Sequence, residues 1–299
     1  MTRRTSVSFD SEGIRCRGDM YVPSGIDNPP VVILAHGFGG QRTWGLPRHV
    51  SRFVEHGYAA LLFDYRTFGE SDGQPRTLIS PRRQLRDWNA AIDYIHTRDD
   101  IDSDRLALWG TSFSGGHVVA TAARRDDVNA IISLVPATDG LVLATNQVRR
   151  RGISSLRRVM TDAAIDISRA LRGGEPHTIP IAGRPDEYAV LNTPEVMTGL
   201  EAIIPEDESF RNECPARIIP SVIAYRPITV AESVDCPAFV VEATRDTLVP
   251  PWTVERLVMK LQDVERIKRP IGHYDVLFGD TFDRVVEREL AFLDSSLHP

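Results

Sequence analysis

Cysteine is scarce in this chain, whose 299 residues include only Cys16, Cys214 and Cys236. The three are far apart and odd in number, and no CxxC or Cys/His spacing suggests a zinc site. The sequence therefore does not indicate a disulfide framework, and we expect free, mostly buried thiols in a reducing compartment. It also implies no metal ion and no organic cofactor.

Long apolar runs and an excess of positive charge are missing as well. The longest apolar runs, such as residues 31–35, are far too short to span a bilayer, and the N-terminus lacks the apolar stretch of a signal peptide. A net charge of −6 with a pI near 5.8 gives no electrostatic reason to expect nucleic-acid binding. We therefore expect a cytoplasmic protein without membrane or nucleic-acid partners, and its sequence is compatible with a homo-oligomer.

The chain does contain short apolar runs, which alternate with amphipathic segments. Residues 5–21 predict two strands around a turn at residues 10–13. Beyond them the alternation is typical of a mostly parallel central sheet with helices on both faces, which is an α/β fold. The predicted buried strands are residues 31–35, 59–63, 106–109, 130–135, 239–243 and 264–269, and the clearest helices are residues 46–56, 81–95 and 281–297.

The alternation stops between about residues 137 and 232. A helical stripe precedes Gly173 and Gly174, and prolines then divide the rest into short pieces; the stripe consists of Leu156, Val159, Met160, Ala163, Ile167 and Leu171. An insertion this long inside an α/β domain usually has a function or forms a subdomain. We predict a core of residues 1–136 and 233–299 and an inserted helical cap of residues 137–232.

The cap is expected to choose the substrate. Its apolar stripe would form the wall of a mainly apolar pocket above the sheet; alternatively, the stripe packs only against other cap segments. Charged residues of the cap are interpreted as solvated faces, although the acidic ones would also suit a substrate amine. These are Arg149, Arg150, Arg151, Arg157 and Arg158, and Glu195, Glu201, Glu206, Asp207 and Glu208.

The segment from Arg105 to Gly116 carries the strongest chemical signal, because a strand there runs through Gly-Thr-Ser-Phe-Ser-Gly into a helix. A serine on so sharp a turn needs small residues two positions before and after it. Gly110 and Ser114 meet this need for Ser112, and Ser114 is a rival nucleophile. The turn also directs the Phe113 amide from the positive end of the helix toward a bound carbonyl.

A serine nucleophile needs a base and an acid that orients the base. His273 follows the strand predicted at residues 264–269 and precedes the last helix, which suits the base. Asp246 follows the strand predicted at residues 239–243 and is the preferred acid, while Asp139 after the preceding strand is the alternative. Activity should then rise as His273 loses its proton, with a midpoint of about pH 6–7.

These motifs together resemble the α/β-hydrolase superfamily. The elbow is similar to G-x-S-x-G, with Ser114 at its fifth position, and the order Ser…Asp…His matches the superfamily. The loop that begins with His36 and Gly37 looks like the superfamily's oxyanion loop, which implies that the Phe38 and Phe113 amides bind the oxyanion. The segment of residues 63–73, FDYRTFGESDG, is similar to a D-x-R-x-x-G-x-S turn, in which Asp64 and Arg66 would hold loops together.

The resemblance implies a serine hydrolase that cleaves a carboxylic ester of a small molecule through an acyl-serine intermediate. Thioester, amide or peptide, and C–C bond hydrolysis use the same triad and remain alternatives. A non-catalytic ligand-binding protein on this fold is an alternative of a different class.

Overall fold

The chain begins with a hairpin of β1 (Thr2–Ser11) and β2 (Ile14–Pro23) in the computed structural model, which describes residues 2–297. Glu12 and Gly13 form its turn with φ values of 56° and 79°, the left-handed conformation that tight two-residue hairpins require. The hairpin was predicted, but its strands extend further. The first residues of β1 are exposed and polar, so they carry no apolar pattern. They are part of the strand because their backbone pairs with β2, starting with Thr2 opposite Pro23.

The hairpin continues into an eight-stranded sheet in the order β1-β2-β4-β3-β5-β6-β9-β10. β1 pairs antiparallel with β2 and β2 with β4, whereas all later pairs are parallel. This confirms the predicted mostly parallel sheet. The remaining strands are β3 (Pro30–Ala35), β4 (Ala59–Phe63), β5 (Asp102–Thr111), β6 (Ala130–Leu134), β9 (Ala238–Ala243) and β10 (Val264–Arg269).

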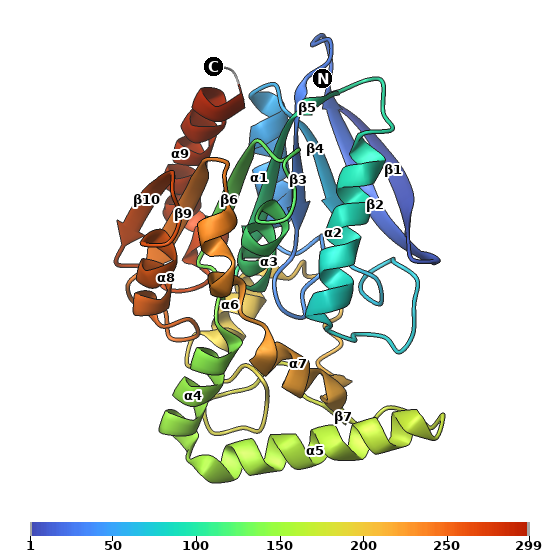
Figure 1. The fold of residues 1–299 in the computed structure, drawn as a ribbon, viewed down its shortest axis with the longest axis vertical. Coiled ribbons are helices and arrows are strands. Elements are labelled where there is room, and N and C mark those ends of the chain that lie inside the picture. Colours follow the sequence, from blue (N-terminus) through green and yellow to red (C-terminus); the bar gives the residue numbers. More distant parts are fainter. Residues whose placement is uncertain (1, 298–299) are drawn as a thin grey trace.

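Helices cover both faces of the sheet and bury an apolar core on each (Figure 1). α1 (Leu46–Glu55) and α9 (Gly279–Leu297) lie on one face, and α2 (Pro81–Ile95), α3 (Phe113–Ala122) and α8 (Pro251–Val258) lie on the other. Successive side chains of a strand point to opposite faces, so Val31 and Ile33 enter one core and Val32 and Leu34 enter the other. The three-layer arrangement is the one expected from the sequence.

Residues 137–232, called the cap here, lie beyond the end of the sheet where β5 meets α3 (Figure 1). A short two-stranded sheet joins the helices of this segment. Its elements are α4 (Gly140–Arg151), α5 (Ile153–Leu171), β7 (Thr178–Ile179), α6 (Val196–Ile203), β8 (Cys214–Pro215) and α7 (Ile219–Ala224).

The apolar stripe predicted on α5 faces the core only in part. Leu156 and Val159 line a cavity and Ala163 is buried, whereas the other members are exposed: Met160 is 39%, Ile167 41% and Leu171 84% accessible. The expectation that the whole stripe forms a wall is therefore wrong.

A buried carboxylate determines how α5 is turned. Asp166 is fully buried and accepts hydrogen bonds from the Arg217 side chain and backbone and from the His177 amide. A buried charge must be paired in this way, so Asp166 takes the inward position and the apolar positions beyond it turn outward.

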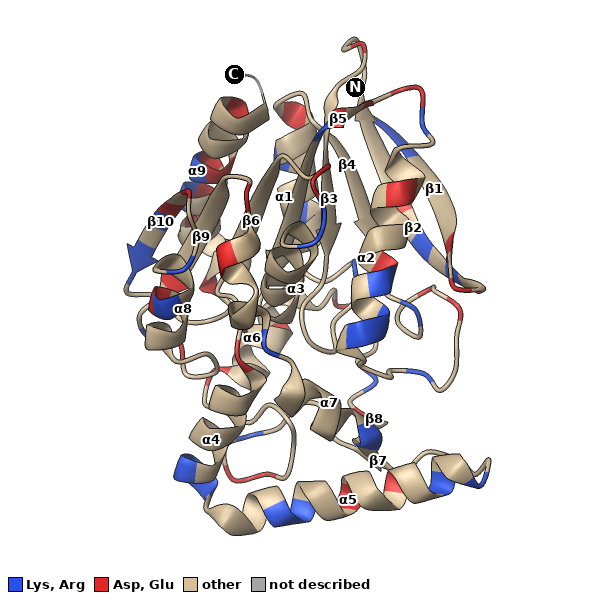
Figure 2. Cartoon of the chain, in the orientation of Figure 1, with Lys and Arg blue, Asp and Glu red and all other residues tan. Residues whose placement is uncertain are grey.

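The cysteines agree with the expectation of free, mostly buried thiols. All three cysteines are free, and Cys16 and Cys214 are buried. Figure 2 shows acidic and basic positions interspersed over the elements, with basic ones at the end of α4. Across residues 2–297 no helix has both the length and the apolar character needed to cross a membrane.

Candidate active site

Ser112 occupies the sharp turn between β5 and α3. Its backbone has φ 56° and ψ −117°, an unfavourable region for a residue with a side chain, and such strain is concentrated at functional sites. Its amide donates to the Leu134 carbonyl of the neighbouring strand at 2.8 Å. A Cβ atom on Gly110 would lie 2.3 Å from the Ser114 carbonyl oxygen, so the turn requires glycine there, as expected.

His273 and Asp246 meet Ser112 in a continuous hydrogen-bonded chain. The Nε2 atom of His273 lies 2.8 Å from the Ser112 hydroxyl, and its Nδ1 atom lies 2.6 Å from Asp246 Oδ2. Both side chains are buried. The other oxygen of Asp246 accepts the Leu248 and Val249 amides, each at 2.8 Å, and these bonds fix the carboxylate in place. The structure thus brings together three residues that lie up to 161 positions apart in the sequence.

The charge environment favours protonation of His273. Burial lowers the pKa of His273, but the charge and hydrogen bond of Asp246, with the charge of Glu195, outweigh burial and raise this pKa above its ordinary value. A raised pKa means a stronger base, which suits an imidazole that takes a hydroxyl proton.

The rival residues lie elsewhere. Ser114 is fully buried, and its hydroxyl lies 2.5 Å from that of Tyr65, so a substrate has no access to it. Asp139 caps α4 by accepting the Val142 amide, and both of its oxygens accept from the Arg226 guanidinium at 2.9 Å. Neither residue contacts His273, so the geometry favours Ser112 and Asp246.

The loop of Phe38 lies against Ser112. Ala35 at the end of β3 pairs in register with Gly110, so the two loops leave the sheet side by side. A Cβ atom on Gly37 would lie 3.3 Å from Ser112 Cβ, which shows how closely the loops approach. Phe38 and Phe113 touch edge to face with ring centroids 5.4 Å apart, and both line the cavity beside Ser112.

Asp64 and Arg66 hold loops together, as expected. Asp64 accepts the Arg42 amide at 2.8 Å and pairs with the Arg42 guanidinium. Arg66 donates to Asp87 on α2 at 2.7 Å and to Ser11 at the hairpin turn. These buried ion pairs fix the loops that follow β3 and β4.

Sequence reasoning missed Glu195, which it assigned to a solvated face. One oxygen of Glu195 accepts the His273 amide at 2.7 Å, and the other accepts the Thr247 amide at 2.6 Å. Gly272 leaves room for this carboxylate, because a Cβ atom there would lie 2.6 Å from it. Glu195 therefore connects the cap to the loops that carry both Asp246 and His273. No signal in the sequence predicts a contact between residues 78 positions apart.

Glu208 makes a second connection of this kind, so its assignment to a solvated face is also wrong. Its carboxylate accepts the Thr43 hydroxyl at 2.7 Å and the Trp44 indole N–H at 3.0 Å. Two acidic side chains of the cap thus hold the loops around the site.

His117, one turn along α3, lies behind the site. It is fully buried, and its Nδ1 atom lies 2.7 Å from the Tyr225 hydroxyl. Burial lowers the pKa of His117 to about 3, so the ring is neutral. Its ring and that of Tyr225 pack against Phe113, which supports the turn from behind.

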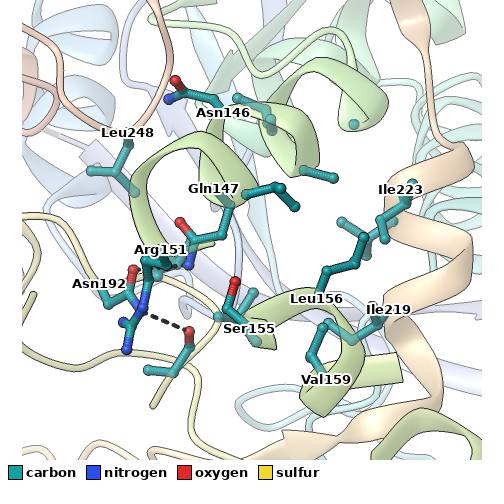
Figure 3. A pocket seen from close by; sticks show the side chains of 18 of the residues that line it. Asn146, Gln147, Arg151, Ser155, Leu156, Val159, Asn192, Ile219, Ile223 and Leu248 are labelled. Carbon is teal, nitrogen blue, oxygen red and sulfur yellow. Dashed lines mark hydrogen bonds between the residues drawn. The ribbon is translucent and has the colours of Figure 1, made fainter. Parts of the chain in front are cut away.

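Two cavities open beside Ser112. The larger, about 500 Å³, is bounded by the cap, with Leu156 and Val159 from α5 and Ile219 and Ile223 from α7 on its wall (Figure 3). The smaller, about 60 Å³, is lined by His273. Among residues 2–297 neither cavity has an Asp or Glu in its lining, and no cluster of three or more His, Cys, Asp or Glu side chains is placed to hold a metal ion.

The chain matches a known protein family. The family described as X-Pro dipeptidyl-peptidase (S15 family) matches residues 12–182, more than half of the chain. The chain belongs to this family of α/β-hydrolases. The S15-family chain is 36% identical to the quorum-quenching protein AidA of Acinetobacter baumannii, over 96% of this chain and 93% of AidA.

Fungal relatives of the S15-family chain are named as a polyketide transferase and a thiohydrolase. It is 29% identical to the polyketide transferase grgF of a Penicillium species, over 97% of this chain and 96% of that protein. The crystal structure of the α/β-hydrolase GrgF from Penicillium sp. sh18 matches 99% of this chain and 100% of that chain with a TM-score of 0.84 and 26% identity. The thiohydrolase aneE of Aspergillus aculeatus is 34% identical over 42% of this chain and 39% of its own length.

Proposed function

We propose that this member of a hydrolase family cleaves a carboxylic ester of a small molecule through an acyl-serine intermediate. Ser112 is the nucleophile, His273 the general base and Asp246 the residue that orients His273. The observation that carries the proposal is the hydrogen-bonded chain from Asp246 through His273 to Ser112, because Ser112 lines a cavity large enough for a substrate.

In the first step the Ser112 oxygen attacks the ester carbonyl while His273 Nε2 takes its proton. The Phe38 and Phe113 amides stabilise the oxyanion, each contributing about 3–4 kcal/mol in comparable enzymes. His273 then gives the proton to the departing alcohol, which leaves an acyl-serine. Water then attacks this ester while His273 takes its proton, and His273 returns that proton to the Ser112 oxygen as the acid is released.

Thioester hydrolysis or acyl transfer is the second candidate, because relatives are named thiohydrolase and polyketide transferase. Both reactions use the same acyl-serine and differ only in the group that arrives or departs. Rates with an ester and a thioester of one acyl group, each with and without an added alcohol, would separate hydrolysis from transfer.

Dipeptidyl-peptidase activity has less support than ester hydrolysis, although the family description includes it. A dipeptidyl-peptidase must bind the free ammonium group of its substrate, for which a carboxylate is the ordinary partner. Within residues 2–297 no carboxylate lines either cavity, and Glu195 and Glu208 are engaged with backbone and side-chain donors of the core.

Hydrolysis of methyl hexanoate, followed by titration of the released acid, tests the proposal and distinguishes an enzyme from a non-catalytic binding protein. We expect wild type and Ser114→Ala to turn over this ester, and Ser112→Ala to lose activity by about 10³-fold or more. Turnover by Ser112→Ala at the wild-type rate would contradict the proposal.

A further inference from the structure

Ser112 lies at the junction of two cavities whose linings differ in one decisive residue. The cavity of about 60 Å³ is lined by His273, whereas the cavity of about 500 Å³ is not. Four residues line both and form the junction: Phe38, Ser112, Leu191 and Leu248. A substrate bonded to Ser112 therefore extends into both cavities.

The chemistry assigns one part of the substrate to each cavity. The proton that His273 takes from Ser112 must pass to the alcohol oxygen when the acyl C–O bond breaks, so the alcohol lies on the side of His273. The acyl chain leaves the carbonyl carbon in another direction, toward the cavity without His273. The small cavity is then the alcohol side and the large cavity is the acyl side.

The walls of the small cavity strongly restrict the size of the alcohol. A volume of about 60 Å³ holds only about two water-sized groups, since each takes about 30 Å³. Trp44, Leu200 and Tyr274 belong to one buried apolar cluster, and all three line the small cavity. The Tyr274 ring rests directly on α6, because a Cβ atom on Gly199 would lie 2.1 Å from it. This wall has little room to yield, so long or branched alcohols are excluded.

The acyl side is far more permissive. Its wall is built largely from apolar side chains of three cap helices, among them Leu143 on α4, Leu156 on α5 and Ile223 on α7. A volume of about 500 Å³ is within the range of sites that enclose whole small-molecule ligands.

We propose that the chain selects esters of long or bulky, mainly apolar acids with small, uncharged alcohols, and that Leu200 on α6 restricts alcohol size. The inference rests on the proposed ester hydrolysis at Ser112. It names the substrate class of that site, and it assigns a role in specificity to a residue outside the triad.

Two isomeric esters test the inference in the wild-type chain. Methyl nonanoate and octyl acetate have the same atoms and similar hydrophobicity, but the long chain lies on the acid in one and on the alcohol in the other. We expect kcat/KM for methyl nonanoate to be about tenfold higher or more, since one misplaced methylene already costs that much in an apolar site. Equal rates, or a preference for octyl acetate, would overturn the inference.

Matched variants locate the restriction. Leu200→Ala should reduce the preference for methyl over butyl nonanoate by about tenfold, whereas Leu156→Ala, the same change on the acyl side, should leave that preference unchanged. An effect of Leu156→Ala equal to that of Leu200→Ala would overturn the role of α6. Hydrolysis of both isomers at equal rates, lost in Ser112→Ala, would refute only the subsite assignment; hydrolysis of neither would refute the proposed function as well.

Discussion

The two oxygens of Asp246 have different tasks. One accepts two backbone amides that fix the carboxylate, and the other accepts the His273 Nδ1–H, which leaves Nε2 free to take the Ser112 proton. Asp246→Asn should keep the fold and lower kcat by about 10³–10⁴, because an amide there stabilises the wrong tautomer. Steady-state kinetics on the folded variant measures this loss.

Asp139→Asn is the matched control. Asp139 pairs with Arg226 and caps α4, so its replacement should weaken the cap while leaving kcat within about tenfold of wild type. If Asp139→Asn were the more damaging change to kcat, the acid would be assigned wrongly.

Glu195 should influence how kcat/KM depends on pH. The pKa of His273 is raised by Asp246 and Glu195 despite burial, so kcat/KM of wild type should rise with pH through a midpoint above 6.5, at the upper end of the sequence-based range or beyond it. Glu195→Gln removes one negative charge, so its midpoint should lie at lower pH. Because an amide cannot accept both backbone donors equally well, kcat should also fall by about tenfold to a hundredfold.

The pH–rate profile distinguishes this role from a purely structural one. Glu201→Gln, an exposed carboxylate on α6, should leave both midpoint and kcat unchanged. An unshifted midpoint in Glu195→Gln would show that Glu195 does not act on His273.

Helix α5 carries two adjacent residues whose replacement should affect substrate preference differently. Val159 lines the large cavity, whereas Met160 is exposed. Val159→Arg should change relative kcat/KM among esters of different acyl length by about tenfold, while Met160→Arg should keep the wild-type ranking. Thermal unfolding would verify that both variants are folded. A changed ranking in Met160→Arg alone would mean that α5 is turned differently from the structure.

The sequence predicted elements best where apolar pattern alone decides them. Residues 59–63 and 264–269 are strands within the predicted limits, because each is bounded by clear breaks. β5 begins at Asp102, earlier than predicted, since its polar start pairs through the backbone across an irregularity beside Pro30. Backbone pairing of polar residues leaves no hydropathy signal.

The cap was predicted less completely, because side-chain contacts between distant residues determine its details. Asp166 turns α5 through Arg217, and Arg150 and Arg151 donate to the Asn192 and Glu187 carbonyls instead of being fully solvated. Such pairs are invisible to a periodicity argument. The assignments of Ser112, Asp246 and His273 needed only motif order and strand ends. This explains why the sequence could predict the three residues that the structure brings together.

A buried ionisable pair lies in the apolar core between the sheet and the helices α1 and α9. His49 on α1 and Glu289 on α9 are fully buried, 3.7 Å apart, and Trp109 donates to Glu289. Burial raises the pKa of Glu289 to about 8 and lowers that of His49 to about 3. Both groups are therefore neutral in the folded protein at neutral pH.

This pair predicts how stability depends on pH. The folded pKa of Glu289 lies above its ordinary value of 4.5, so its contribution is fully present below pH 4.5 and is lost as pH rises through about 8. The contribution of His49 no longer changes above its ordinary value of 6.5. Between pH 6.5 and 8 the wild-type Tm should therefore fall more than that of Glu289→Gln.

Glu287→Gln, an exposed change on the same helix, is the control and should follow wild type. If the Tm of Glu289→Gln fell as steeply as that of wild type in this range, Glu289 would already be ionised in the folded protein.

Ser112 is proposed as the nucleophile of a serine hydrolase. The most direct test is to label the protein with a fluorophosphonate and to identify the modified peptide by mass spectrometry. The probe reacts preferentially with a serine that a base has activated. We predict one modified residue, Ser112, in wild type and in Ser114→Ala, and no labelling of Ser112→Ala. Labelling of Ser112→Ala, or modification mapped to another serine of the wild-type chain, would contradict the account.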